Sequence, residues 1–398
     1  MKAAFLYLFA LIIGGSGALA QEVIRPIRPS DTDPAITTFN TDSHYVYLRN
    51  DVVPVGALLV HLPGSFGEPK RATRFGRHAA SLGFHSIGLM YPNVPTVGSF
   101  CSNNSDPDCF ESVRREIVEG IDHSTELNIL PQESILSRTR MLLLYLKNNF
   151  PNEQWGQFLD ENDQIRYDKV LFSGHSQGGG NAALIAKYYP IRRALCFSAP
   201  KDWRNQTDAP PLWLSQGNWQ TPPAQIYAFN HELDEHTPRQ LAIWDALGLN
   251  TLAQPVNVDN NAAPYAQSRQ LTTNVAVPAG DDHASTIQDN KTPLENGIPV
   301  FAPVWTYMLT GNEIITRTEN AAQTSFRILK NPNGGQFSID LTQTDNEIKI
   351  IDLSGKVIEV GEFGQGLHTL FFPELKPGMY SIVVRNAAGF SAQRLLIQ

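Results

Sequence analysis

One segment near the middle of the chain constrains the fold more than any other. The apolar run Val170 to Phe172 leads into Gly174-His-Ser-Gln-Gly178, and the stretch after it is rich in Ala and Leu up to Tyr189 and Pro190. In the pattern Gly-x-Ser-x-Gly, the serine stands on a tight strand-to-helix turn that its glycine neighbours make sterically possible. The segment predicts a strand, a turn that exposes the hydroxyl of Ser176, and a helix that ends before the proline. The alternative interpretation is an ordinary glycine-rich turn.

A serine nucleophile needs a base that takes its proton, and His283 is our candidate. We interpret Asn274 to Val277 as the last strand of a sheet, and His283 lies in the polar loop Gly280 to Ser285 that follows it. Single histidines are more often solvent-exposed or satisfied within a core. The assignment therefore depends on the position of His283 after the last predicted strand.

The acid that orients such a histidine is expected after the preceding strand, which we predict over Ala224 to Phe229. That run ends in Asn230-His-Glu-Leu-Asp-Glu-His236, and Asp234 stands where a loop carboxylate can reach an imidazole nitrogen. The competing carboxylates are Glu232, Glu235, Asp245 and Asp259. His231 and His236 are five residues apart rather than four, which is roughly 140° around a helix, so the segment does not fit a helical zinc motif. No metal is expected.

Acyl transfer to a serine also needs two backbone N–H donors aimed at the developing oxyanion. One is expected to be the amide of Gln177, directly after the nucleophile. The other is expected from the loop Pro63-Gly-Ser-Phe-Gly67, which follows the apolar run Val55 to Leu62. We assign it to Ser65 or Phe66 and leave the choice open, because the loop lacks the His-Gly-Gly-Gly form of many lipases. The alternative is an ordinary strand-to-helix turn.

These four motifs, in the chain order Ser, Asp, His, resemble the α/β-hydrolase family over roughly Asp42 to Thr310. The resemblance implies an α/β fold with a mostly parallel sheet flanked by helices, and catalytic groups on loops at the carboxyl ends of the strands. The alternation of strand-like and helix-like segments independently favours a parallel sheet. Further helices are predicted over Arg71 to Leu82 and Gln132 to Phe150, and further strands over His85 to Met90 and Arg193 to Ser198.

The amino-terminal residues predict export. Lys2 precedes an apolar run from Ala3 to Ile13, and Ala18-Leu-Ala20 satisfies the small-x-small rule for cleavage before Gln21. We expect residues 1–20 to be a signal peptide, and no other stretch approaches the length of an integral membrane segment. The formal net charge of −8, with Lys and Arg scattered along the chain, argues against a nucleic acid as partner.

The three cysteines fit an oxidising compartment. Cys101 and Cys109 flank the polar loop Ser102 to Asp108, which a disulfide between them would staple. Cys196 lies inside an apolar strand, and we expect it to be a buried free thiol.

Residues that select the substrate are less well defined. The long insertion Asn93 to Asp168 is expected to cover part of the site. Four tryptophans are candidates for lining an acyl or sugar pocket, although aromatic residues more often belong to a core: Trp203, Trp213, Trp219 and Trp244. We expect His175 to support the turn, and Arg114 and Arg115 to lie on a solvated helix face rather than to contact an acidic substrate.

The organisation of the chain changes near Gly311. Residues 21–311 form the predicted catalytic domain, and residues 312–325 are polar and without apolar periodicity, which is typical of a linker. From 326 to 398, short β-like runs alternate with Gly, Pro and Asn turns. Their spacing predicts a small β-sandwich.

This tail resembles the C-terminal sorting domain of the type IX secretion system of Bacteroidetes-type bacteria. The resemblance is carried by Asn331-Pro332 with Gly335 before Phe337, by Asp352-Leu-Ser-Gly355, and by Leu375-Lys-Pro-Gly378-Met-Tyr380. It implies periplasmic transit, export to the cell surface or the medium, and the type IX secretion machinery as partner. The chain departs from the pattern at its end, which lacks the usual lysines. The rival interpretation is a carbohydrate-binding or adhesive module, but the tail has no tryptophan.

These features together predict a secreted serine hydrolase, expected to act as a monomer without a cofactor. It would cleave a carboxylic ester through an acyl-enzyme. An acylated polysaccharide or a polyester is the substrate class that secretion and fold suggest. A peptidase or amidase would use the same three residues. A surface binding protein on a silent hydrolase scaffold is the alternative from another class, because fold alone does not establish activity.

Overall fold

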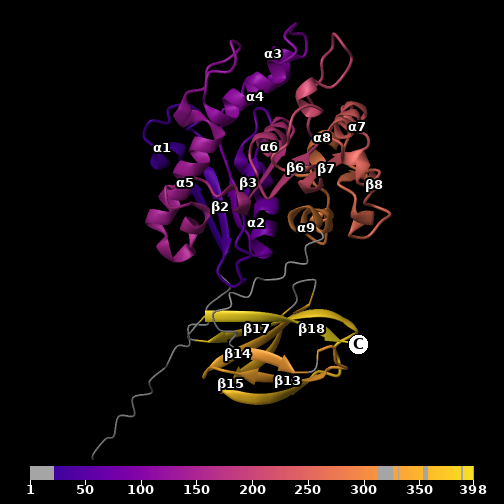
Figure 1. Ribbon diagram of the computed structural model, residues 1–398. Coiled ribbons are helices and arrows are strands. Elements are labelled where there is room, and N and C mark those ends of the chain that lie inside the picture. Colours follow the sequence, from indigo (N-terminus) through magenta and orange to yellow (C-terminus); the bar gives the residue numbers. More distant parts are fainter. Residues whose placement is uncertain (1–21, 312–325, 330, 353–356, 387–388, 398) are drawn as a thin grey trace, which may run out of the picture.

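The computed structural model describes residues 22–311, 326–329, 331–352, 357–386 and 389–397 (Figure 1). Three predictions therefore lie outside the described residues: the signal peptide, the linker over 312–325, and the part of the sorting signature at 353–356.

The amino-terminal part of the structure is built on one sheet of nine strands in the order β1-β2-β4-β3-β5-β6-β7-β9-β8 (Figure 1). The strands are β1 (Glu22–Ile27), β2 (His44–Arg49), β3 (Leu58–Leu62), β4 (His85–Gly88), β5 (Val170–His175), β6 (Arg193–Phe197), β7 (Ile226–His231), β8 (Val256–Asn257) and β9 (Gln270–Thr273). Neighbours from β4 to β8 pair in parallel. Only β1 and β2 are antiparallel additions at one edge. The predicted α/β class with a mostly parallel sheet is confirmed.

Helices cover both faces of this sheet. They are α1 (Pro29–Thr32), α2 (Thr73–Ser81), α3 (Val97–Cys101), α4 (Cys109–Glu119), α5 (Ile135–Asn149), α6 (Gln177–Tyr188), α7 (Thr237–Ala246), α8 (Asp282–Ser285) and α9 (Ala302–Thr310). Successive strand residues point to opposite faces. Val60 and Phe172 therefore pack with α4, α5, α6 and α7, whereas Leu59 and Leu171 pack with α2 and α9. The result is a three-layer arrangement with two buried cores.

The last strand of the sheet is not where the sequence pattern placed it. Asn274 to Val277 is not a strand, and β9 instead spans the four residues before it. The side chains of β9 are buried because its threonine hydroxyls find acceptors. Oγ1 of Thr272 donates to Glu232 (2.7 Å), and Oγ1 of Thr273 donates to Asp259 (2.6 Å). A β-branched residue with a satisfied hydroxyl suits a buried strand, and periodicity of apolar residues alone does not detect it.

The carboxyl-terminal part contains two antiparallel sheets. One has the order β12-β13-β16 and the other β15-β14-β17-β18. The strands are β12 (Phe326–Leu329), β13 (Gln336–Leu341), β14 (Asn346–Asp352), β15 (Val357–Phe363), β16 (Gly366–Phe371), β17 (Gly378–Asn386) and β18 (Gly389–Ile397). Side chains from both sheets, such as Ile339 and Ile382, share one buried cluster. This is the predicted small β-sandwich. A separate hairpin, β10 (Leu294–Glu295) and β11 (Ile298–Pro299), belongs to the amino-terminal part.

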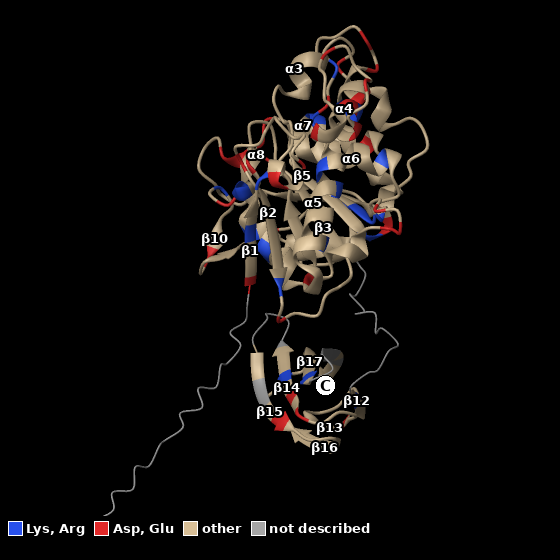
Figure 2. Ribbon diagram, turned by 90° about the vertical axis from the view of Figure 1, so that its left-hand side faces the viewer, with Lys and Arg blue, Asp and Glu red and all other residues tan. Residues whose placement is uncertain are grey.

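Charged residues of both signs are interspersed along the ribbon (Figure 2). Among the described residues, no helix combines the length and the apolar character needed to cross a bilayer.

Candidate active site

Ser176 occupies a strained turn between β5 and α6. Its backbone has φ 53° and ψ −115°, a conformation that residues other than glycine rarely adopt. The turn is tightly packed. A Cβ on Gly174 would lie 2.2 Å from the carbonyl carbon of Gly178, and a Cβ on Gly178 would lie 2.2 Å from the carbonyl oxygen of Leu62. Both glycines are therefore required sterically, and strain of this kind concentrates at functional sites.

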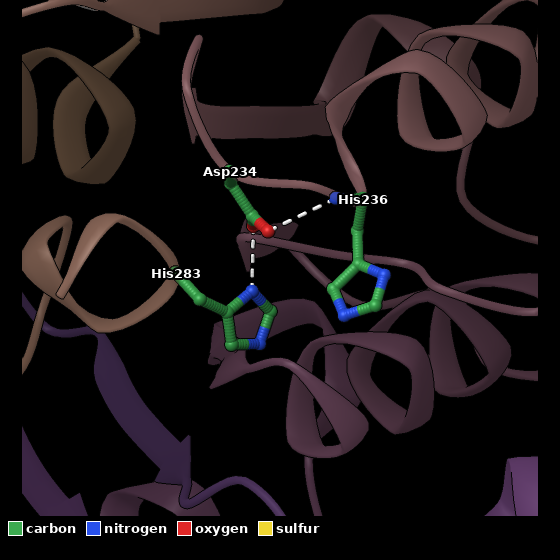
Figure 3. A group of neighbouring side chains, drawn as sticks. All are labelled: Asp234, His236 and His283. Atoms are coloured by element: carbon green, nitrogen blue, oxygen red, sulfur yellow. Dashed lines mark hydrogen bonds and ion pairs between the residues drawn. The ribbon is translucent and has the colours of Figure 1, made fainter. Parts of the chain in front are cut away.

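His283 lies in the short helix α8 rather than in the predicted loop, and it faces Asp234 in the turn between β7 and α7 at the carboxyl edge of the sheet. Nδ1 of His283 lies 2.6 Å from Oδ2 of Asp234 (Figure 3). An ionised carboxylate only accepts hydrogen bonds, so Nδ1 is the donor and Nε2 of the neutral imidazole is an acceptor. The side chain of Asp234 is 1% exposed and that of His283 is 27% exposed. Nε2 of His283 makes no hydrogen bond to any described residue, which leaves it available to take a proton.

The start of α7 holds Asp234 in its charged form. Oδ1 of Asp234 accepts a hydrogen bond of 3.1 Å from the backbone amide of His236. Burial alone would raise the pKa of Asp234, but the hydrogen bond from His283 and the amide of His236 outweigh it and keep this pKa below its ordinary value. The imidazole of His283 is thus oriented by a carboxylate that remains ionised at neutral pH.

His175 connects the serine turn to helix α8, which carries His283. Nε2 of His175 donates to the carbonyl oxygen of His283 at 2.9 Å, and the two ring centroids are 4.9 Å apart. Burial, with a smaller contribution from the charge of His283, lowers the pKa of His175 to about 3. His175 is neutral at any ordinary pH, and its contacts are those of a structural support.

The loop after β3 lies directly against the nucleophile turn. A Cβ on Gly64 would be 3.3 Å from Cβ of Ser176. Nδ2 of Asn93 donates to the carbonyl oxygens of Gly64 (2.9 Å) and Gly67 (2.8 Å), which fixes the loop from its other side. Within the described part of the chain, the amides of Ser65 and Phe66 donate to no acceptor. The amide of Ser65 or Phe66 is therefore free to act as the second N–H donor, beside that of Gln177.

The insertion predicted to cover the site contacts Gln177, the first helical residue after Ser176. Oε1 of Gln177 accepts from the amide of Val97 in α3 (3.0 Å) and from Oγ of Ser65 (2.9 Å). One side chain thus joins the insertion, the loop after β3 and the start of α6. A disulfide between Cys101 and Cys109, with a Cα–Cα distance of 5.4 Å, joins the end of α3 to the beginning of α4.

The expectation for Arg114 is wrong. Arg114 is 2% exposed and lies beneath α6 rather than on a solvated face. Its Nε and Nη2 donate to Oδ2 (2.8 Å) and Oδ1 (2.5 Å) of Asp202, and its Nη1 donates to the carbonyl oxygen of Gln177 (3.1 Å). The guanidinium packs so closely that a Cβ on Gly180 would lie 2.3 Å from Nη2. Arg114 supports the helix that starts after Ser176, a role that no local feature of the sequence indicates.

The candidate pocket tryptophans belong mainly to the core. Trp203, Trp213 and Trp244 are buried, and Trp219 is partly buried against the same cluster. None of these four tryptophans is an exposed platform for a sugar ring.

The free thiol Cys196 is also buried, and burial raises its pKa to about 12.

His236 completes the only group within the described residues whose side chains bring three potential metal ligands together. Asp234, His236 and His283 offer ligand atoms within 4.8 Å of one another (Figure 3). Asp234 and His283, however, approach to 2.6 Å in a hydrogen bond. Two ligands on a tetrahedral zinc, each about 2.0 Å from the metal, stand more than ~3 Å apart, so a shared ion would have to break that bond. The donor set fits a proton-transfer pair better than a metal centre.

Comparisons with known proteins bear on the two parts of the chain differently. Residues 328–398 match a family described as a secretion system C-terminal sorting domain. This confirms the resemblance of the tail to type IX sorting domains and shows export to the cell surface or the extracellular space, with the secretion machinery as a partner. No curated protein sequence matches the chain.

Among solved structures, one match is a protein from Klebsiella pneumoniae subsp. pneumoniae MGH 78578, provisionally assigned as a dienelactone hydrolase. It has 11% sequence identity, with 67% of this chain and 89% of that chain covered, and a TM-score of 0.33. At that TM-score the function has to be argued from the residues of the site itself.

Proposed function

We propose that this exported chain is a serine hydrolase that cleaves a carboxylic ester, with Ser176 as nucleophile, His283 as general base and Asp234 as the acid that orients it. The observation that supports this most directly is the 2.6 Å hydrogen bond between Asp234 and His283. It leaves Nε2 of His283 buried and unpartnered in α8, the helix that His175 ties to the strained serine turn.

In the first half of the proposed reaction, Oγ of Ser176 attacks the ester carbonyl carbon and its proton moves to Nε2 of His283. The negative charge that develops on the carbonyl oxygen is held by the amide of Gln177 and that of Ser65 or Phe66. Collapse of this tetrahedral intermediate breaks the bond to the alkoxide. His283 returns the proton to the departing alcohol, and the acyl group remains on Ser176.

In the second half, water attacks the acyl-enzyme while His283 accepts one of its protons. The second tetrahedral intermediate forms in the same pair of N–H donors. Its collapse returns the proton to Oγ of Ser176 and releases the carboxylic acid. Asp234 remains ionised throughout, in keeping with its lowered pKa, and stabilises the imidazolium that forms twice in each cycle.

Hydrolysis of a panel of p-nitrophenyl esters, from acetate to palmitate, tests this proposal. The full chain is expected to turn over at least part of the panel, and the Ser176→Ala variant is expected to lose that turnover. A fluorophosphonate probe should label the parent protein and not the variant. Ser105→Ala is the matched control, because Ser105 is exposed and far from the turn in sequence, and it should keep full activity and labelling.

The alternatives give different results in the same experiment. A peptidase or amidase would be labelled by the fluorophosphonate at Ser176 but would prefer amide or peptide substrates to esters. A binding protein on a silent scaffold would neither be labelled nor turn over any substrate of the panel, and this outcome would overturn the proposal.

A further inference from the structure

The two most exposed large hydrophobic side chains among the described residues both belong to the catalytic loops. Leu233 is 71% exposed and Phe66 is 66% exposed. Leu233 immediately precedes Asp234, and Phe66 lies on the loop that supplies a candidate oxyanion donor. Single exposed hydrophobic residues need no explanation. Here, however, the highest exposures coincide with the two loops on either side of the nucleophile.

The topology places these side chains on opposite sides of Ser176. Phe66 follows β3 and Leu233 follows β7, while Ser176 follows β5, and the order within the sheet is β3-β5-β6-β7. All four strands are parallel, so their following loops emerge at one edge. Three strand spacings separate β3 from β7, about 14 Å. Phe66 and Leu233 therefore stand on the two flanks of the catalytic edge.

Hydrogen bonds restrain the backbone at both positions. Phe66 has φ 57°, in the left-handed region that a bulky residue seldom adopts. A hydrogen bond of 2.9 Å from the amide of Gly67 to the carbonyl oxygen of Gly64 closes the turn around it, and Asn93 clamps both of these residues. The amide of Leu233 donates to Nδ1 of buried His231 at 3.2 Å. Phe66 and Leu233 thus expose apolar side chains to solvent from a strained turn and from a hydrogen-bonded turn, respectively.

A sugar-binding site would be expected to present exposed indole faces. None of the six tryptophans is exposed, since five are buried and Trp219 is partly buried. The rim of this site offers apolar side chains instead. Burial of apolar surface is favourable in proportion to the area removed from water, so these side chains gain most from a hydrocarbon partner.

We infer that Phe66 and Leu233 form a specificity-determining rim that contacts the hydrocarbon part of the substrate, so that the enzyme acts on esters of apolar acids rather than on acetylated sugars. This inference depends on the proposed function, because it assigns the substrate class of the same site. The ester bond broken and the products are those described above.

The test is the ratio of kcat/KM for p-nitrophenyl octanoate to that for p-nitrophenyl acetate, measured on the full chain and on Leu233→Ser and Phe66→Ser. We expect each substitution to lower this ratio about fivefold to tenfold, which is below or at the lower end of the discrimination that one methylene group gives in an enclosed apolar pocket, because the rim is open to solvent. The matched control is Ile298→Ser, which removes a side chain of similar exposure, 63%, from the β10–β11 hairpin. It should leave the ratio unchanged.

Failure of the inference is distinguishable from failure of the proposed function. If the parent chain hydrolyses no ester and Ser176 takes no fluorophosphonate, the proposed function is wrong. If esters are hydrolysed but both rim variants keep the parent ratio, only the inference about the rim is refuted. The same holds if the parent chain cleaves acetylxylan faster than p-nitrophenyl octanoate. The alternative partner of the exposed leucine is a second copy of the chain, and sedimentation velocity tests it. A parent dimer that Leu233→Ser converts to monomer would assign the exposed leucine to a second copy of the chain and overturn the inference.

Discussion

Arg114 and Asp202 form a two-point ion pair beneath the helix that begins at the nucleophile turn, with both side chains at most 3% exposed. Asp202 also accepts from Nε1 of Trp213 at 3.1 Å, and Arg114 also donates to Oδ1 of Asn181 at 2.7 Å. Each charge has several partners, so the pair is a satisfied buried network rather than an isolated contact.

Removing one member of this pair should be strongly destabilising. Arg114→Met leaves the Asp202 carboxylate buried without its partner, and we expect the free energy of unfolding to fall by about 3–5 kcal/mol in urea titrations. Lys147→Met is the control. It breaks an ion pair with Asp163 whose side chains are 43% and 42% exposed, and such pairs contribute at most about 1 kcal/mol. Equal effects of the two substitutions would contradict a structural role for Arg114.

Asp234→Asn should abolish most of the activity without unfolding the protein. The amide can no longer hold His283 in the tautomer whose Nε2 accepts a proton, and in serine triads this change lowers kcat about 10⁴-fold. Glu232→Gln is the matched control, because Glu232 is the competing carboxylate two residues away. Its side chain instead accepts from Asn257 and Thr272. Steady-state kinetics in which Glu232→Gln is the more damaging change would reassign the acid.

Asn93→Ala should impair catalysis more than binding. The substitution removes both hydrogen bonds that hold the loop of the second oxyanion donor. The donor is misplaced rather than deleted, so we expect kcat to fall by about 10-fold to 10²-fold, below or at the low end of the effect of removing a donor outright. KM should change little. Asn104→Ala, which loses two exposed hydrogen bonds, one to Glu126 and one from the amide of Asp106, should change neither constant. A purely structural role would lower the melting temperature and leave kcat of the folded fraction intact.

Acid should destabilise the fold through its buried histidines. Burial lowers the pKa values of His44 and His61 to about 3 and that of His78 to about 4. In the unfolded chain these residues titrate near 6.5, so between that pH and about 4 the unfolded state binds more protons. The stabilisation is complete above pH 6.5 and is lost as the pH falls, by up to about 1.4 kcal/mol per pH unit for each histidine. Urea midpoints at pH 7, 6 and 5 measure this slope.

A matched variant isolates one of these histidines. His78→Gln keeps a side chain able to bond to Oγ1 of Thr306, which lies 2.8 Å from Nε2 of His78, and it cannot titrate. The free energy of unfolding of this variant should depend less steeply on pH, because its unfolded state binds one proton fewer than that of the parent chain. A stability that is flat or rises from pH 7 to pH 5 in the parent chain would show that these histidines are protonated in the folded state.

Chelation should leave the hydrolase activity unchanged. Although Asp234, His236 and His283 lie close together, the proposed chemistry needs their proton acceptors and no ion. Dialysis against EDTA is expected to preserve esterase activity within experimental error. Loss of activity on chelation, restored by Zn²⁺, together with activity in Ser176→Ala, would replace the serine mechanism with a metal-dependent one.

Much of the fold could be predicted because its information is local. The strand, turn and helix around Ser176 follow from the apolar run and the glycines, and the order of motifs along the chain led to Asp234 and His283. The position of the last strand could not be predicted, because the second half of β9 is two threonines whose hydroxyls donate to the carboxylates of Glu232 and Asp259. Hydrogen-bonding partners of that kind are set by tertiary contact and not by periodicity.

The residues that support the site could not be predicted from the sequence for the same reason. Arg114 meets Asp202 across 88 residues, and Asn93 meets Gly64 across 29. Nothing in the neighbourhood of either residue distinguishes it from a surface arginine or a loop asparagine. His236 had a local signal, since it stands two residues after the predicted acid, but spacing alone did not show that its ring would lie 5.4 Å from that of His283.

The close packing around Gly64 also bears on how a protein of this kind can change over evolution. A side chain at Gly64 would collide with His175 and crowd Ser176, and one at Gly180 would collide with Arg114. Almost any substitution of these two glycines should therefore disturb the packing around Ser176 or Arg114. Phe66 and Leu233 carry no such constraint on their exposed side chains, so variation can accumulate there at little cost to folding. We therefore expect substitutions of these two exposed side chains to change the proposed substrate preference while the proposed reaction stays the same.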